Sequence, residues 1–364
     1  MKVAIVIPTL SKYDAVGNDA MGMYHYFVKR DCKVRFFVNE TTHEKLPVDS
    51  LGRLKKFVRT DDLVVLHHSI GWPGSLEAIR ALDCRKVLKY HNITPAHFFT
   101  GISSEFERSC ELGRTELARV SSTRFDLYLG DSAFNIKDLQ DSTGIEGNFG
   151  VVPPFHHTDE LVAREAAFAT LIRLNDDSKN ILCVGRLVPN KGHMDLIRAF
   201  SHYYHHYNQR SRLLLIGHPD PRLSTYTGKL RDLVQEENLE NGVQIFGGVR
   251  TPDLKAVYLT ADLVVMVSQH EGFCVPLVEA MAFRIPIVAL GAGAVGETVG
   301  QAGIVWDEFD PALFSVSMNC VLSDSRTSLA LGKMGRKRYD DEFSTRIIER
   351  KLSNGLKSIG VHFG

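Results

Sequence analysis

Short apolar runs alternate along the chain with longer stretches in which hydrophobic residues recur every three to four positions. The runs have the length and β-branched composition of buried strands, and the stretches between them have the period of amphipathic helices. This alternation is typical of α/β proteins with parallel sheets. Ten strands are expected, at residues 3–7, 34–38, 63–66, 87–90, 127–129, 181–184, 213–216, 243–246, 263–267 and 285–290.

A proline pair in G-V-V-P-P-F, at 150–155, separates the first five strands from the last five. A chain of 364 residues is also long for a single core. We therefore expect two doubly wound, Rossmann-like domains facing each other across a cleft, one at 1–155 and one at 156–342. The charged stretch 336–357 has helical periodicity and no strand after it. The segment 343–364 is expected to form a C-terminal helix that packs back on the first domain.

The segment 268–281 reads S-Q-H-E-G-F-C-V-P-L-V-E-A-M and follows an apolar run. Pro276 suits the first turn of a helix, because its missing N–H is not needed there. Glu271 is then expected in the loop at the carboxyl end of a strand, where open α/β sheets bind ligands. Glu279 is expected in the first helical turn, beside an anion-binding helix end. Two carboxylates for hydroxyl groups beside an anion site fit a sugar nucleotide.

A second motif, V-G-R-L-V-P-N-K-G at 184–192, runs from the end of a strand into a helix. Arg186 and Lys191 are expected to project from this loop and to bind phosphate oxygens. Taken alone, an Arg and a Lys at this spacing are more often solvated surface cations. In the first half, His91 lies just past a strand in a proline-containing loop. A single histidine is more often structural than catalytic.

Composition narrows the range of partners and compartments. The 43 basic and 43 acidic residues cancel, which argues against nucleic acid as the main partner. Six cysteines without C-x-x-C spacing fit a reducing compartment better than a disulfide scaffold or zinc site. No apolar stretch has the ~20 residues that a membrane span requires. The first apolar run is interpreted as a strand, not a signal peptide.

Three other features invite functional interpretations that we consider weaker. Gly291, Gly293 and Gly296 spell the G-x-G-x-x-G dinucleotide fingerprint, but later glycines leave little room for its helix, so NAD is rejected. No D-x-D triplet occurs, so the chain lacks this common metal-chelating motif. The basic and apolar run 51–59 is by default a solvated helix face, and peripheral membrane docking is the alternative.

The two motifs of the second half together resemble those of the retaining family-4 glycosyltransferases, which have the glycosyltransferase B (GT-B) fold. E-G-F-C-V-P-L-V-E-A-M contains that family's paired glutamates, and G-R-L-V-P-N-K-G its phosphate clamp. The resemblance implies that Glu271 contacts the donor sugar and Glu279 the ribose. It implies that Arg186 and Lys191 hold the diphosphate and that His91 lies beside the transferred sugar. His91, Glu271, Arg186 and Lys191 are thus the implied catalytic residues.

The resemblance also implies further contacts from loops in each half. The donor contacts that it adds are Gly17, Gly272, Phe273, Cys274 and Val275. The acceptor contacts are Asn18 and Asp19, in the loop that follows the first strand. Acceptor choice is expected to depend on first-domain loops around Asn18, His67, His68 and Phe98. No metal and no cofactor are implied, because the cations replace a metal at the diphosphate.

The function expected from this resemblance is metal-independent, retaining transfer of a hexose from a GDP- or UDP-sugar to a glycan or lipid-linked acceptor. The resemblance also implies a role in cell-surface polysaccharide synthesis. The protein is then expected in the cytoplasm or bound peripherally to the inner face of the membrane. Two alternatives remain: a sugar-nucleotide hydrolase or epimerase, and a non-catalytic sugar-nucleotide-binding subunit. The hydrolase needs a glutamic acid as proton donor. A helix start at Glu279 is expected to lower its pKa, which disfavours that alternative.

Overall fold

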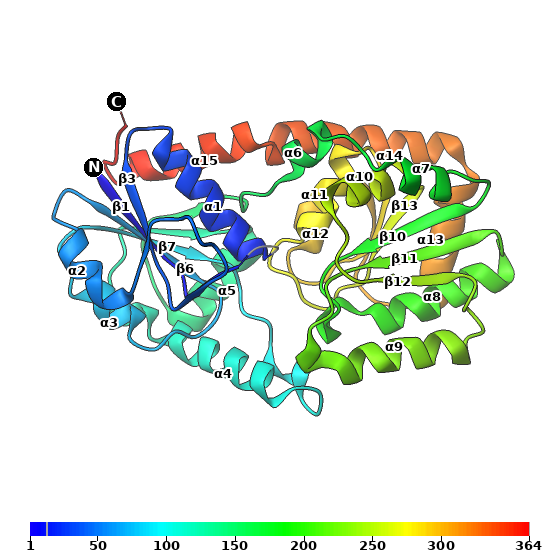
Figure 1. Cartoon of the computed structure of the whole chain (residues 1–364), viewed down its shortest axis with the longest axis horizontal. Helices are drawn as coiled ribbons and strands as arrows, with labels where there is room; N and C mark the ends of the chain where they lie inside the picture. The colour runs from blue at the N-terminus through cyan, green and yellow to red at the C-terminus, as the bar shows by residue number, and fades with distance from the viewer. Residues whose placement is uncertain (12–13, 364) are drawn as a thin grey trace. The chain divides into compact units, whose positions relative to one another are not determined.

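The computed structural model describes residues 1–11 and 14–363, which form two compact units, each with its own parallel sheet (Figure 1). Unit 1 comprises Met1–His97, Glu105–His157 and Thr345–Gly364. Unit 2 comprises Phe98–Ser104 and Thr158–Ser344. The chain thus begins and ends in unit 1, and each unit is described by itself below.

The sheet of unit 1 has seven parallel strands in the order β5-β3-β1-β6-β7-β8-β9. Helices lie on both of its faces, with α1 and α15 on one and α3 and α4 on the other (Figure 1). The central strand β6 is buried along its whole length, as expected for a parallel strand covered on both sides. The strands are β1 (Lys2–Val6), β3 (Lys33–Phe37), β5 (Val48–Asp49), β6 (Leu63–His68), β7 (Arg85–Tyr90), β8 (Leu127–Gly130) and β9 (Phe149–Val151). The helices are α1 (Ala15–Val28), α2 (Leu54–Phe57), α3 (Ser75–Arg80), α4 (Ser104–Ala118), α5 (Ala133–Thr143) and α15 (Thr345–Ser358), and a small separate sheet pairs β2 (Thr9–Leu10) with β4 (Glu40–Thr41).

The sheet of unit 2 has six parallel strands in the order β12-β11-β10-β13-β14-β15. This is the doubly wound order, and the chain reverses direction across the sheet between β10 and β13, where such folds bind ligands. The strands are β10 (Lys179–Val184), β11 (Ser211–Ile216), β12 (Val243–Phe246), β13 (Leu263–Met266), β14 (Ile287–Leu290) and β15 (Gly303–Trp306). The helices are α6 (Thr158–Ala163), α7 (Phe168–Leu174), α8 (His193–His206), α9 (Ser224–Glu236), α10 (Thr251–Thr260), α11 (Val275–Ala282), α12 (Val295–Val299), α13 (Pro311–Ser323) and α14 (Ser325–Arg338).

The prediction of two doubly wound α/β domains is confirmed, and all ten expected strands are present. The structure divides the stretch 336–357, whose periodicity is helical, between two helices. α14 ends at Arg338, a π-helical turn η6 follows at Tyr339–Phe343, and α15 begins at Thr345. α15 packs into the hydrophobic core of unit 1 through Ile348, Leu352 and Leu356.

The basic and apolar run 51–59 forms a 3-10 turn η1 (Leu51–Arg53) followed by the short helix α2. Leu54, Phe57 and Val58 are buried in unit 1, whereas Lys55 and Lys56 are exposed. The apolar side of this run therefore faces the protein's own core. None of the helices among the described residues is long and apolar enough to cross a membrane.

Candidate active site

In unit 2, a buried ion pair joins the two loops that the sequence singled out. Lys191 lies at the end of the turn η4 (Pro189–Lys191) after β10, and Glu271 lies in the loop between β13 and α11. Lys191 Nζ is 2.5 Å from Glu271 Oε1, and the side chains are 16% and 8% exposed. Burial acts to lower the pKa of Lys191, but the Glu271 charge, the nearby Cys274 and the hydrogen bond to Glu271 together outweigh burial and raise the pKa above its ordinary value. Lys191 therefore stays charged at neutral pH.

Backbone contacts hold these two loops against each other. Gln269 N donates to Asn190 O at 2.8 Å, and Asn190 Nδ2 donates to His270 O at 3.2 Å. Gly192 follows with a φ of 67°, and a Cβ there would lie 2.2 Å from Val267 O. Only glycine allows this close approach, which brings the Lys191 loop against the end of β13.

The glycine motif at 291–296 supports Glu271 from its other side. Gly293 has a φ of 63°, and a Cβ on it would lie 2.3 Å from Glu271 O. Ala294 N donates to the same carbonyl oxygen at 2.9 Å. The helix α12 that follows has only 5 residues. The motif therefore positions the Glu271 backbone, which gives its glycines a role that needs no dinucleotide.

A second cation and the start of a helix occupy the same edge of the sheet. Arg186 follows β10 and is exposed, and its side chain makes no hydrogen bond or ion pair within the described residues. Cys274, at the N-cap of α11, is buried in the left-handed region with φ 76° and ψ 74°. Pro276 lies in the first turn of α11, as predicted. The first N–H groups of a helix lack partners inside it, so this helix start can bind an anion.

The residues on either side of Cys274 fix the shape of this loop. Phe273 is buried, its carbonyl oxygen accepts from Thr298 Oγ1 at 2.8 Å, and its ring contacts that of Phe343. Gly272 and Val275 are partly exposed. The expected donor contacts from Gly272 to Val275 thus lie on one well-anchored turn.

The structure corrects two expectations for Glu279. α11 begins at Val275, so Glu279 is in its second turn, not its first. Its Oε2 accepts a hydrogen bond from Tyr258 Oη at 2.5 Å. Burial raises the pKa of Glu279 to about 7, although the Tyr258 hydrogen bond acts to lower it. The expected lowering by the helix start is therefore wrong, because desolvation dominates.

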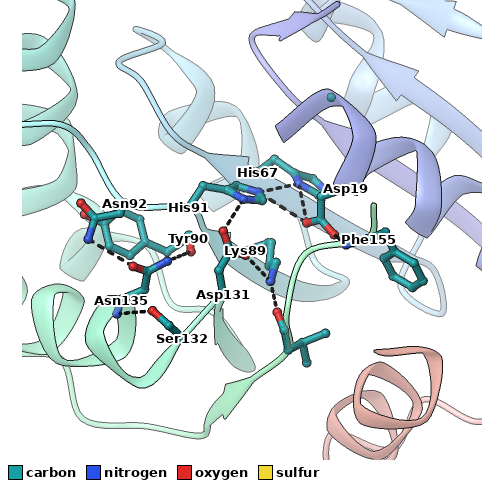
Figure 2. A network of polar contacts seen from close by, with 12 residues as sticks. Asp19, His67, Lys89, Tyr90, His91, Asn92, Asp131, Ser132, Asn135 and Phe155 are labelled. Carbon is teal, nitrogen blue, oxygen red and sulfur yellow. Dashed lines mark hydrogen bonds and ion pairs between the residues drawn. The ribbon is translucent and has the colours of Figure 1, made fainter. Parts of the chain in front are cut away.

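In unit 1, His91 belongs to a chain of buried polar residues (Figure 2). It follows β7, as predicted, and its Nδ1 is 2.9 Å from Asp131 Oδ2. Its Nε2 is 2.9 Å from Nδ1 of His67, the fifth residue of β6. Lys89 Nζ is 2.5 Å from Asp131 Oδ1 and also donates to the carbonyl oxygen of Val152. Both ring nitrogens of His91 are thus engaged.

The residues expected in the loop after the first strand lie instead in the first turns of α1. Asp14 caps this helix and accepts from Gly17 N at 3.0 Å. Asn18 Oδ1 is 3.2 Å from His157 Nε2. The Asp19 side chain is fully buried, and its Oδ1 accepts from Phe155 N at 2.7 Å. Asp19 therefore points into the core of unit 1, which does not suit the acceptor contact expected of it.

Sequence reasoning missed Lys89, Asp131 and Tyr258. Lys89 is a lysine in the buried second half of β7, and Asp131 follows β8 as His91 follows β7. β7 and β8 are neighbours, so the rule that located His91 also applies to Asp131. Burial acts to raise the pKa of Asp131, but His91 and Lys89 outweigh it and lower the pKa below its ordinary value. His67 and His68, expected in a loop, end β6 instead.

Comparison with known proteins finds a family match for the second half of the chain. Residues 169–338, which contain the Lys191–Glu271 pair, match the family described as Glycosyl transferases group 1. This part of the chain, a little under half of it, is similar to that family. Among the relatives of the chain is the D-inositol 3-phosphate glycosyltransferase of Corynebacterium efficiens. It is 31% identical over 159 residues, which are 43% of the present chain and 37% of that protein.

Two further proteins are similar over more of the chain. One is the GDP-mannose-dependent α-(1-6)-phosphatidylinositol monomannoside mannosyltransferase of Mycobacterium tuberculosis, 25% identical over 68% of this chain and 65% of that one. The present chain thus spans less than two thirds of either relative in these matches. The other is the solved structure of Anabaena HepE in complex with UDP-glucose, with a TM-score of 0.78 and 16% identity over 98% of this chain and 100% of that one. This likeness shows the shared GT-B fold.

Proposed function

We propose that the chain is a retaining glycosyltransferase that moves a hexose from a nucleotide-diphosphate sugar, GDP- or UDP-linked, to a hydroxyl group of an acceptor. The observation that carries the proposal is the Lys191–Glu271 pair, with Arg186 in the same loop as Lys191 and α11 beginning shortly after Glu271. This arrangement offers cations and backbone N–H groups for a diphosphate, and a carboxylate for sugar hydroxyls. A mannosyltransferase relative named for GDP-mannose and a fold neighbour solved with UDP-glucose support this donor class.

The reaction breaks the anomeric C–O bond, and negative charge develops on the leaving diphosphate. Arg186, Lys191 and the first N–H groups of α11 stabilise that charge where it forms, as an oxyanion hole does. Each such donor is worth ~3 kcal/mol, so the loss of Arg186 should slow the reaction about a hundredfold. Glu271, held by Lys191 and by the Ala294 N–H, is oriented to accept hydrogen bonds from the sugar.

His91 acts in this proposal by its position and not as a proton shuttle. Asp131 and His67 engage its two ring nitrogens, and its side chain is only 4% exposed. Its backbone N–H donates to His68 O at 3.0 Å, which fixes the start of the loop. A rigid imidazole edge orients a bound sugar without exchanging protons with it.

The acceptor in this proposal is a glycan or a lipid-linked glycan of cell-surface polysaccharide synthesis. A relative that acts on a phosphatidylinositol mannoside supports a lipid-linked acceptor. Any membrane contact of the run 51–59 has to rest on exposed cations such as Lys55 and Lys56, because Leu54 and Phe57 are buried. Such a contact is electrostatic and weakens with salt.

Thermal stability with UDP, GDP, ADP and their sugar conjugates tests the donor site. A ligand at a hundred times its dissociation constant stabilises by about 2.7 kcal/mol. We expect a shift for one nucleotide that Arg186→Ala abolishes and that Arg231→Ala keeps, since Arg231 is an exposed arginine on α9 of the same unit. All samples contain EDTA, and the shifts in thermal stability are compared among them. If no nucleotide stabilises the protein, the diphosphate site is refuted.

A sugar-nucleotide hydrolase is a second candidate, because the pKa of about 7 for Glu279 suits a general acid. The amount of free sugar released distinguishes a transferase from a hydrolase. A transferase consumes donor in proportion to added acceptor, whereas a hydrolase releases the same free sugar without one. Loss of acceptor-independent release in Glu279→Gln, with nucleotide binding retained, would favour the hydrolase.

A further inference from the structure

Three buried side chains from different elements of unit 1 direct ligand atoms at one point (Figure 2). Asp19 lies on α1, His67 on β6, and His91 directly after β7. Asp19 Oδ2 is 3.6 Å from His67 Nδ1 and 3.6 Å from His91 Nε2, and the two nitrogens are 2.9 Å apart. The side chains of Asp19 and His67 are fully buried and that of His91 is 4% exposed.

The polar atoms of this cluster are not all satisfied. Asp19 Oδ1 accepts from Phe155 N, but Oδ2 receives no hydrogen bond from the residues that the structure describes. Its separation of 3.6 Å from each imidazole is too long for one. A buried carboxylate oxygen without a donor is unfavourable, so its position calls for a partner.

The spacing of the three atoms is that of ligands around one transition-metal ion. A point equidistant from them lies about 2 Å from each, which matches Zn–N and Zn–O distances of ~2.0–2.2 Å. Tetrahedral ligands at that radius are ~3.4 Å apart. The observed separations of 2.9 and 3.6 Å lie on either side of this value.

We propose that Asp19, His67 and His91 bind a divalent transition-metal ion, with Zn²⁺ the ion that the two imidazoles and one carboxylate suit best. A water molecule takes the fourth position. The ion ties α1, β6 and the loop after β7 together within unit 1. It also fixes the ring of His91.

The surroundings of the cluster suit a cation. Asp131 Oδ2 is 2.9 Å from His91 Nδ1, so it completes a carboxylate–histidine–metal arrangement that fixes the ring and its tautomer. Lys89 Nζ is 2.5 Å from Asp131 Oδ1, and these two charges compensate each other. The carboxylate of Asp19 is then the charge that a bound cation balances. A proton shared by the two histidines is the competing explanation.

The metal site shares His91 with the proposed function, but the diphosphate site consists of residues of unit 2 alone, so metal binding and nucleotide binding can fail separately. Metal content after dialysis against Zn²⁺ and then metal-free buffer is the first test. We expect about one zinc ion per wild-type chain, and at least a tenfold weaker affinity in Asp19→Asn and His67→Gln. His68→Gln is the matched control, because His68 is the next residue of β6 and belongs to no ligand set here. Zinc below about a tenth of an equivalent in the wild type, or equal content in all variants, would overturn the proposal.

A second measurement does not depend on the loss of a ligand. His67→Cys and His68→Cys are each loaded with Co²⁺, which replaces Zn²⁺ and reports its ligands by absorption. We expect the intense near-ultraviolet band of a cobalt–thiolate bond in His67→Cys alone, because a cysteine sulfur is itself a zinc-type ligand. The same spectrum in both variants would place the metal elsewhere and overturn the assignment.

Discussion

The raised pKa of Glu279 makes a prediction about the stability of unit 2 that a single substitution isolates. Burial shifts this pKa from 4.5 to about 7, while Tyr258 Oη donates to the carboxyl group at 2.5 Å. Glu279→Gln keeps the shape and an oxygen that accepts from Tyr258, but it removes the titration. The wild type and the variant should therefore differ in how their stability depends on pH.

The sign follows from which state holds the proton. Between pH 4.5 and 7 the unfolded chain has released the proton of Glu279 and the folded unit retains it. Stability of the wild type relative to the variant is thus highest below pH 4.5 and falls as pH rises to 7. At 1.36 kcal/mol per pKa unit, the total loss across this window is about 3 kcal/mol. Above pH 7 the difference between the two proteins should be constant.

Urea unfolding followed by the fluorescence of Trp306 measures this loss. Trp306 is in β15 of unit 2, and Trp72, which belongs to unit 1, is replaced by Phe in every protein compared. We expect the free energies of unfolding of wild type and Glu279→Gln to diverge by about 3 kcal/mol between pH 4.5 and 8. Glu240→Gln, at an exposed position of unit 2, should follow the wild type. Parallel pH profiles for wild type and Glu279→Gln would refute the reasoning.

Two further predictions concern residues that hold Glu271 in unit 2 and His91 in unit 1 in position. Gly293→Ala should destabilise unit 2 by at least about 2 kcal/mol, because its Cβ would meet Glu271 O at 2.3 Å and its φ is 63°. Gly296→Ala in the same motif meets nothing within 4 Å and should be neutral or slightly stabilising, so equal effects in urea unfolding would contradict this role of Gly293. Lys89→Met and Asp131→Asn should each cost unit 1 about 3–5 kcal/mol, since each leaves a buried charge unpaired. The double variant should cost less than the sum by about 1–3 kcal/mol, and additive effects in a double-mutant cycle would contradict the pairing.

The central strands could be predicted because each is a short, continuous apolar run. An amphipathic helix instead shows apolar residues at every third or fourth position. The strands that escaped prediction are short and lie toward the sheet edges, such as β5 at Val48–Asp49, β9 at Phe149–Val151 and β15 at Gly303–Trp306. β15 has an apolar sequence, G-I-V-W, but it is only four residues long and only partly buried. Their pairing depends on the neighbouring strand, which is not visible in the local pattern.

The break between α14 and α15 has a similar origin. Helical periodicity continues through Tyr339–Phe343, but tertiary contacts there favour a π-helical turn. Phe343 packs on the ring of Phe273, and Tyr339 Oη donates to Asp159 Oδ1 at 2.5 Å. Both partners are distant in sequence, so the propensity of the segment alone does not reveal the turn.

At the candidate site, a residue that directly follows one strand could be located from the sequence. A contact or pKa that depends on two neighbouring elements could not. Glu271 and Lys191 each follow a strand that the apolar pattern located. The pairing of Lys89 with Asp131 depends on the adjacency of β7 and β8. The pKa of Glu279 depends on its burial and on Tyr258 from α10, and neither is visible in the local sequence.

The Lys191–Glu271 pair decides which substitution can test the donor site. Lys191 neutralises a nearly buried carboxylate, so its removal leaves Glu271 uncompensated and threatens the fold of unit 2 as well as donor binding. A Lys191 variant that loses activity therefore does not distinguish the two roles. Arg186 is exposed and no described residue pairs with it, so Arg186→Ala should leave the free energy of unfolding within about 0.5 kcal/mol of wild type. An about hundredfold loss of turnover at unchanged stability is the result that only a diphosphate contact at Arg186 explains.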